Sequence, residues 1–295
     1  MTVGDNPFYP EIGTISKMID IEFAGLTDTG KKRDHNEDAY YVDPDLGLYV
    51  VSDGMGGHLA GEVASGLVVD TMRDYMKRFE SGNEVEELAD ADDSLSRDAN
   101  RLFSGIMLSN RVVHEMSQTN EGYRGMGATV SSLYFTDSTV IVGNVGDSPI
   151  YLIHEGNIEM LSTLHTVMEE QRLLDPDGDM RLGENFRHML TRAMGAEPSV
   201  LPDVIEIPCF RGDILTISSD GLTDLVSPEE IMDIVTNDRP ERSCQKLVDL
   251  ANERGGVDNI TVVVVKVKGI KGAGGGLRSF FYRKLRSLFS VPLKK

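Results

Sequence analysis

The sequence predicts an α+β fold in which antiparallel sheets are flanked by helices. Three observations support this class. Strand-like segments occur in groups, two helical stretches follow the first group, and two more precede the last strand. Strict strand–helix alternation, which is typical of parallel sheets, is missing. With 295 residues, 40% of them apolar, the chain can bury one large core or two small ones.

The first half of the chain contains three strand-like segments and two long helical ones. Residues 18–30 alternate between apolar and polar side chains, and residues 39–54 form two strand patterns joined at Asp43-Pro44-Asp45. From Ala60 onward, apolar residues recur along one helix face. Residues 81–93 are acidic and contain few large apolar groups, which predicts an exposed connection. A second helix then turns these residues inward: Leu95, Ala99, Leu102, Phe103, Ile106, Met107 and Val113.

The second half is mostly strands, with helices near its end. Residues 128–161, 203–210 and 212–221 predict strands separated by turns. Ser227, followed by Pro228 and by Glu230 three positions on, predicts a helix that begins with a capping box. A further helix is expected at 240–254, and a buried strand at 259–268.

Residues 162–190 are polar and rich in His, Asp and Glu. A long connection of this kind within a compact domain is often a functional flap. Its histidines, His165 and His188, are either groups of such a flap or solvated loop residues.

The net charge of −19 makes nucleic acid an unsuitable partner, because phosphate backbones are repelled. The charge is uneven, since residues 266–295 contain nine basic residues and no acidic one, which leaves −28 for the remainder. Cys209 and Cys244 have no metal-binding or disulfide spacing, which favours buried thiols in a reducing compartment. No run of 18 apolar residues and no export leader is found, so we expect a cytoplasmic protein.

Carboxylates recur at the ends of the predicted strands. Asp53 stands in "DGMGGH" directly after an apolar run, where a phosphate-binding loop is excluded because an acidic residue would repel phosphate and no Gly-Lys-Ser/Thr follows. Glycines instead leave the main chain open to close approach, and a carboxylate beside a carbonyl oxygen is a suitable ligand pair for Mg²⁺ or Mn²⁺. Further strand-end carboxylates would complete such a site: Asp147, Asp220, Asp258 and the pair Glu37-Asp38. Each Asp-Gly alone is also an ordinary turn signal.

Seven stretches together carry a family resemblance. They are "TDTGKKRDHNEDA", "VVSDGMGGHLAGEVAS", "GATVSSLYF", "VGNVGDS", "LTRAMG", "ISSDGLTDLVSPEEI" and "GGVDNITVVVV". In this order the chain resembles the metal-dependent protein serine/threonine phosphatases of type 2C, in their bacterial form, over about residues 20–268. The resemblance implies two antiparallel sheets packed face to face between outer helices, in α-β-β-α layers. It also places the catalytic domain at residues 17–268, after a loosely ordered lead at 1–16.

The resemblance implies a centre of two Mn²⁺ or Mg²⁺ ions, which Asp53 would bridge. The carbonyl group of Gly54 and the carboxylate of Glu37 or Asp38 would complete the shell of one ion. A water activated by both ions would then hydrolyse phosphoserine and phosphothreonine on proteins, with no covalent enzyme intermediate.

The remaining residues carried over from the family are Asp220, Asp258, Asp147 and Arg33. Asp220 and Asp258 would hold the second ion, and Asp147 with Asp220 would form a weaker third site. Arg33 would bind the substrate phosphate through a two-pronged hydrogen bond; without the motif, a surface pair with Asp34 would be the simpler reading. Family background further implies phosphorylated protein partners, among them a bacterial serine/threonine kinase and its substrates.

The chain departs from the family pattern in three places. Met55 stands where eukaryotic members have a histidine, which leaves the general acid unassigned. Pro149 replaces the arginine of the usual Gly-Asp-Ser-Arg, and Leu164 replaces the acid of Asp-His-Ser at the start of the flap.

Residues 269–295, outside the resemblance, combine a Gly-rich linker with a basic amphipathic tail. Such a tail can pack on the acidic body, contact a protein partner or lie on an anionic membrane surface.

The leading hypothesis is therefore an active protein phosphatase. The alternative is a catalytically inactive module of the same fold that binds phosphoproteins. The presence of Asp38, Asp53, Asp220 and Asp258 favours the enzyme. A Ca²⁺-stabilised binding domain is disfavoured, because no contiguous acidic EF-hand loop is found.

Overall fold

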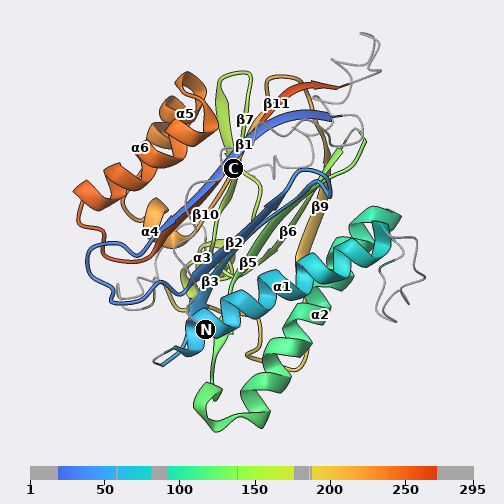
Figure 1. Cartoon of the computed structure of the whole chain (residues 1–295), viewed down its shortest axis with the longest axis vertical. Coiled ribbons are helices and arrows are strands. Elements are labelled where there is room, and N and C mark those ends of the chain that lie inside the picture. Colours follow the sequence, from blue (N-terminus) through green and yellow to red (C-terminus); the bar gives the residue numbers. More distant parts are fainter. Residues whose placement is uncertain are drawn as a thin grey trace.

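The computed structural model describes residues 19–57, 59–80, 92, 94–137, 139–175, 186 and 188–270. In these residues two antiparallel sheets lie face to face, and helices cover the outer face of each sheet (Figure 1). The predicted α-β-β-α layering is therefore confirmed.

Each sheet is assembled from strands distant in the sequence. The first has the order β1 (Ile19–Asp28), β11 (Ile260–Ile270), β10 (Ile214–Ser218), β7 (Ile150–His154) and β8 (Asn157–Met160). The second has the order β2 (Asp38–Asp43), β3 (Leu48–Met55), β5 (Val130–Phe135), β6 (Thr139–Val145) and β9 (Asp203–Pro208). A short strand, β4 (Gly127–Ala128), pairs with the end of β3.

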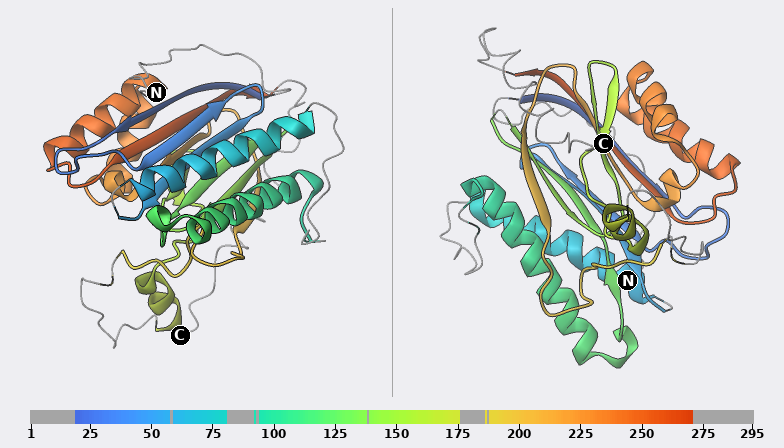
Figure 2. Two further views of the ribbon diagram at one scale, coloured as in Figure 1. Left: turned by 60° about the horizontal axis from the view of Figure 1, so that its bottom comes forward. Right: turned by 180° about the vertical axis from the view of Figure 1, so that it is seen from behind.

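The helices divide between the two outer faces, as the views in Figure 2 show. Helices α1 (Ala60–Glu80) and α2 (Arg97–Thr119) pack on the second sheet. Helices α4 (Asp220–Thr223), α5 (Pro228–Asn237) and α6 (Pro240–Glu253) pack on the first. Two short elements, η1 (Glu121–Tyr123) and α3 (Val167–Leu174), lie in connections.

The side chains of β11 alternate between two buried environments, which explains why its sequence contains four consecutive valines. Val263 and Val265 point into the layer between the two sheets, whereas Val262 and Val264 point toward Leu247 of α6. All four valines are fully buried. A stretch of strand that is covered on both faces is apolar at successive positions, and this strand begins two residues after Asp258.

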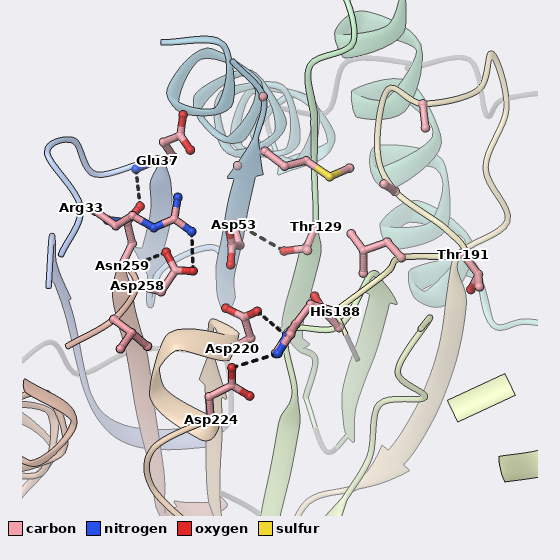
Figure 3. Close-up of a pocket in the computed structure, with 18 residues that line it drawn as sticks. Arg33, Glu37, Asp53, Thr129, His188, Thr191, Asp220, Asp224, Asp258 and Asn259 are labelled. Carbon is pink, nitrogen blue, oxygen red and sulfur yellow. Dashed lines mark hydrogen bonds and ion pairs between the residues drawn. The ribbon is translucent and has the colours of Figure 1, made fainter. Parts of the chain in front are cut away.

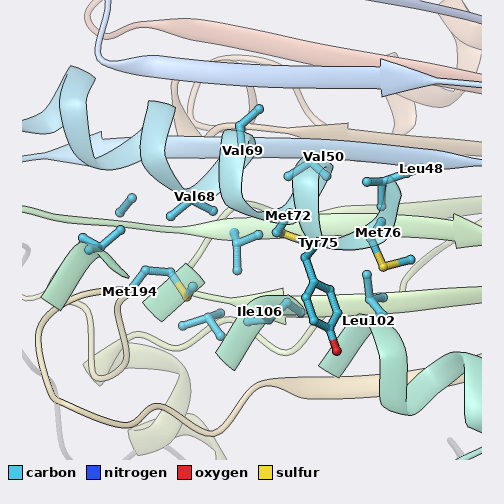
Figure 4. Packing of buried hydrophobic residues seen from close by; sticks show 14 of the residues in the cluster. Leu48, Val50, Val68, Val69, Met72, Tyr75, Met76, Leu102, Ile106 and Met194 are labelled. Atoms are coloured by element: carbon cyan, nitrogen blue, oxygen red, sulfur yellow. The ribbon is translucent and has the colours of Figure 1, made fainter. Parts of the chain in front are cut away.

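The two long helices bury the faces that their apolar periodicity predicts. Met72 and Tyr75 of α1 and Leu102 and Ile106 of α2 pack together on Val50 of β3 (Figure 4). The next residue of β3 faces the other way, into the layer between the sheets. Strand β3, which carries Asp53 at its end, is therefore held from both faces.

The predicted capping box is confirmed at the start of α5, where Ser227 and Glu230 each accept a hydrogen bond from the other's backbone N–H. The single turn of α4 was not predicted. Most of the predicted connection at 81–93, the lead at 1–16 and residues 271–295 lie outside the described residues. Among the helices that are described, none is long and apolar enough to cross a membrane.

Replacing Leu102 by alanine should lower the free energy of unfolding by about 2–5 kcal/mol, because the side chain is fully buried between α2 and the sheet. Urea unfolding followed by circular dichroism measures this change. Leu174→Ala is the matched control, since Leu174 is 87% exposed and should shift stability by less than about 0.5 kcal/mol. Equal effects of the two substitutions would contradict the packing described.

Candidate active site

Both sheets end at one cavity of about 730 Å³. Figure 3 shows carboxylates from the end of β3, the start of α4 and the residues before β11 directed into it. Seven of the eight predicted site residues line this cavity: Arg33, Glu37, Asp53, Gly54, Asp147, Asp220 and Asp258. The structure thus brings together carboxylates that are more than 200 positions apart in the sequence.

The eighth residue, Asp38, is buried behind the cavity. It pairs with Asp53 across strands β2 and β3. Its Oδ2 accepts hydrogen bonds from Ser219 Oγ at 2.8 Å and Thr261 Oγ1 at 2.6 Å. Its Oδ1 is buried without a hydrogen-bond partner among the described residues. An unpaired buried carboxylate oxygen costs free energy unless a cation or a donor meets it, so this atom fits a site built around metal ions.

Gly54 allows the main chain to close around the cavity. Its N–H donates to the carbonyl oxygen of Glu37 at 3.1 Å. A Cβ on Gly54 would lie 2.1 Å from the Gly61 oxygen and 2.6 Å from the Glu37 oxygen. Only glycine therefore fits between the start of α1 and the loop before β2.

A neutral side chain, Asn259, fixes the loop that carries Arg33. Its amide Nδ2 donates to the carbonyl oxygens of Thr29 and His35 at 3.0 and 2.9 Å, and its Oδ1 accepts from Glu37 N–H at 2.8 Å. Sequence reasoning did not select it, because an amide does not titrate and is not a charged ligand. Asn259 nevertheless joins the start of β11 to the loop on the other side of the cavity.

Arg33 lies at the rim and does not pair with Asp34. Its Nη2 donates to Asp258 Oδ2 at 2.7 Å, and the side chain is half-exposed. One edge of the guanidinium is thus anchored to a wall carboxylate, and the remaining N–H groups can serve an anion in the cavity.

The carboxylates raise one another's pKa values. Burial, followed by the charges of Asp38, Asp220, Asp147 and Asp258, raises the pKa of Asp53 well above its ordinary value. Burial, followed by the charge of Asp220, raises the pKa of Asp147 to about 7. Burial is also the main cause of the raised pKa of Asp38. Such a cluster of hard oxygen donors carries negative charge that no nearby cation balances fully, and it fits divalent cations.

His188 also lies at this cavity. Its Nδ1 is 3.4 Å from Asp220 Oδ2, and its Nε2 is 3.4 Å from Asp224 Oδ2. The hydrogen bond with Asp220 is the main cause of the raised pKa of the imidazole.

His165 has a different environment, because it is only 2% exposed and its Nδ1 accepts from Gly146 N–H at 3.1 Å. The solvated-loop interpretation is therefore wrong for His165. This residue instead supports the turn that carries Asp147.

Comparisons with known proteins agree with this geometry. A family model described as protein phosphatase 2C matches residues 27–260. Protein phosphatase PhpP of Streptococcus pneumoniae is 33% identical over 257 residues, which cover 84% of this chain and 98% of PhpP.

Two solved structures are also similar. Serine/threonine phosphatase Stp1 from Staphylococcus aureus has a TM-score of 0.71 and 31% identity, over 89% of this chain and all of that one. The catalytic domain of the phosphatase PstP in complex with 2 manganese ions has a TM-score of 0.70 and 28% identity, over 84% of this chain and 98% of that one.

The metal-free protein should lose stability as the pH rises from 5 to 7. A carboxyl group whose pKa is raised on folding binds its proton more tightly in the folded state, and this contribution is lost as the pH passes through the folded-state value, which is about 7 for Asp147. One pKa unit corresponds to about 1.4 kcal/mol, or about 3–6 °C in Tm for a domain of this size.

Thermal unfolding in EDTA across this pH range measures the effect, and Asp147→Asn should reduce the slope. Saturating Mn²⁺ should flatten it, because bound carboxylates stay ionised throughout. A Tm in EDTA that increases between pH 5 and 7 would show that the carboxylates do not repel one another as described.

Proposed function

The chain belongs to the protein phosphatase 2C family and is a metal-dependent protein serine/threonine phosphatase, and from this premise we propose that the carboxylate cavity is its active site. The observation that carries the proposal is the convergence of buried carboxylates from both sheets, with Asp38 Oδ1 left without a partner behind them. A core of this kind is expensive to fold without bound cations, and its position beside Arg33 suits a phosphate ester.

We assign the two core ions, Mn²⁺ or Mg²⁺, to two groups of ligands, one from the second sheet and one from the first. Asp53, near the end of β3, lines the cavity and would contact both ions. Glu37 and the carbonyl of Gly54 would hold one ion. Glu37 is preferred over Asp38 because it lines the cavity, whereas Asp38 Oδ2 already accepts two hydrogen bonds.

Asp220 and Asp258 would hold the other ion, since both line the cavity and flank β10 and β11, which are neighbouring strands of the first sheet. When bound, the pair of ions supplies an activated water near neutral pH and neutralises phosphate charge.

The protein's own residues bind and orient the substrate. Arg33, anchored to Asp258, presents N–H donors to the phosphate oxygens. Met55 lines the same cavity and has no proton to donate, so the leaving oxygen must take its proton from another group or from solvent. The inactive alternative is not supported, because the full carboxylate set is present in one cavity and the similar proteins are named as phosphatases.

The substrates are phosphorylated proteins, and we propose that they include a bacterial serine/threonine kinase and the proteins it phosphorylates. Support for this comes from the chemistry, since such a kinase must supply the phosphoesters. We further propose a cytoplasmic catalytic domain at residues 17–268, with the tail at 269–295 contacting a protein partner or an anionic membrane surface. Residues 266–295 contain nine basic residues and no acidic one. This positive charge supports a contact with an anionic surface.

Hydrolysis of a phosphothreonine peptide should require Mn²⁺ or Mg²⁺ and stop in EDTA. Asp220→Ala should lower kcat/KM by more than about 100-fold, because it removes a proposed metal ligand. Loss of a residue that only supports a ligand already costs about 10- to 100-fold. Phosphate release measures the rate. Asp249→Ala, on the exposed face of α6, is the control and should keep full activity. A wild-type protein that binds Mn²⁺ but releases no phosphate would refute the proposal.

Arg33→Ala should raise KM by roughly 10- to 100-fold, because a charge-assisted hydrogen bond contributes about 1.5–3 kcal/mol. Arg33→Lys should restore only part of this loss, since an ammonium group cannot bond Asp258 and a phosphate in the same fork geometry. Steady-state kinetics separates KM from kcat. Lys32→Ala is the control from the same exposed loop, and an equal increase in KM for it would remove the special role of Arg33.

A further inference from the structure

Residues 190–197 form a wall of the active-site cavity whose lining residues carry no charge. These lining residues are Leu190, Thr191, Ala193 and Ala196. Figure 3 places Thr191 on the opposite side of the cavity from Arg33. The carboxylates proposed as metal ligands come from other segments, and so does the arginine assigned to the phosphate. What the 190–197 wall can offer a substrate is therefore a neutral surface for the polypeptide around the phosphorylated residue.

Two side chains of α2 hold the 190–197 wall from behind. Asn110 is fully buried, its Oδ1 accepts Gly195 N–H at 2.8 Å, and its Nδ2 donates to the Glu197 carbonyl oxygen at 3.1 Å. One helical turn further along, His114 Nδ1 donates to the Gly195 carbonyl oxygen at 3.0 Å. One face of α2 thus binds both backbone groups of Gly195 and the carbonyl group of Glu197.

The 190–197 wall lies so close to α2 that only glycine fits at position 195. The φ angle of Gly195 is 82°, which is in the left-handed region that favours glycine. A Cβ on Gly195 would lie 2.3 Å from Cγ1 of Val113, which is itself fully buried. The position of the wall relative to α2 is therefore fixed by close packing as well as by three side-chain hydrogen bonds.

On its other side the 190–197 wall is bonded to the strand end that carries Asp53. Met194 N–H donates to the Ala128 carbonyl oxygen at 2.8 Å, and Ala128 N–H donates to the Met194 carbonyl oxygen at 3.1 Å. The next residue, Thr129, donates its N–H to the Asp53 carbonyl oxygen at 2.8 Å, and its Oγ1 accepts Asp53 N–H at 3.0 Å. The wall therefore lies between α2 and the segment that is hydrogen-bonded to Asp53.

We propose that Asn110 and His114 are positioning residues for the polypeptide part of the substrate, because they set where the 190–197 wall stands relative to the carboxylates. The inference rests on the proposed function, since it concerns substrate binding in the same cavity. A phosphopeptide brings a chain as well as a phosphate into the cavity, whereas p-nitrophenyl phosphate brings a single ring. A displaced wall should therefore weaken the binding of phosphopeptides and leave the small ester unaffected.

The half-buried His114 allows a test with little risk to folding. His114→Phe keeps an aromatic ring but removes the N–H donor, so KM for a phosphothreonine peptide should rise by about 2- to 10-fold, the effect of one hydrogen bond. The kcat for the peptide and kcat/KM for p-nitrophenyl phosphate should stay within about twofold of wild type. His114→Asn should restore the peptide KM, because the Nδ2 of asparagine can donate to the same carbonyl oxygen.

Asn110→Leu tests the buried half of the contact. This substitution leaves Gly195 N–H and the Glu197 carbonyl oxygen without their partner, so the peptide KM should rise by about 10- to 100-fold. Leu102→Ala is the matched control, because Leu102 is a fully buried residue of the same helix that does not contact the wall through a hydrogen bond. This control should lower stability and keep the wild-type ratio of the two substrates' kcat/KM values.

Steady-state kinetics with both substrates in saturating Mn²⁺ decides between the outcomes, and the two His114 variants suffice if Asn110→Leu does not fold. An unchanged peptide KM in His114→Phe, an equal loss of kcat/KM for both substrates, or the same shift in Leu102→Ala would overturn this inference and leave the proposed function intact. Wild-type protein that binds Mn²⁺ and hydrolyses neither substrate would contradict the proposed function itself.

Discussion

Repulsion among buried carboxylates is the constraint on which the rest of this structure depends. Burial, followed by the charges of Asp38 and Asp220, raises the pKa of Asp53 well above its ordinary value, and the repulsion among ionised carboxylates destabilises this end of the sandwich unless cations are bound. The fold must therefore supply binding energy elsewhere that keeps the charged end closed. The positions of the carboxylates must therefore be held against this repulsion by well-packed strands and by hydrogen bonds between the sheets.

The restraint is supplied across the two sheets. Asp38 belongs to the second sheet, but the hydroxyl groups that hold its Oδ2 belong to Ser219, after β10, and Thr261, in β11 of the first sheet. Ser219 Oγ also accepts the backbone N–H of Thr261 at 2.9 Å. These bonds tie the sheets together directly behind the cavity. Three apolar layers farther along the strands make the same elements rigid, which is what a site needs if charges are to stay in place.

Local patterns predicted most strands and helices and the carboxylates at the strand ends, the family resemblance supplied the roles expected of those carboxylates, and tertiary contacts were needed for the rest. Strand alternation and the capping box at Ser227 are encoded within a few residues, and the structure confirms them. Adjacent acids such as Glu37 and Asp38 cannot be distinguished in the sequence, because only the pairing of β2 with β3 decides which one faces the cavity.

The residues that sequence reasoning missed share one property. Asn259 and Asp224 reach the site through partners that lie far away in the chain: the loop at Thr29–His35 for Asn259, and His188 for Asp224. A single-turn helix such as α4 has no periodicity to detect. Long-range partners of this kind leave no local signature.

Charge balance limits how this cavity can receive a phosphate. Six carboxylates line it, and Arg33 is the fixed cation among its lining residues. If all six are ionised, two divalent ions and Arg33 still leave an excess negative charge, and Asp38 behind the cavity adds to it. A phosphate monoester carries about two negative charges near neutral pH, so such a cavity would oppose its own substrate. The weaker third site that the family resemblance implies at Asp147 and Asp220 would, with a divalent ion bound, cancel that excess.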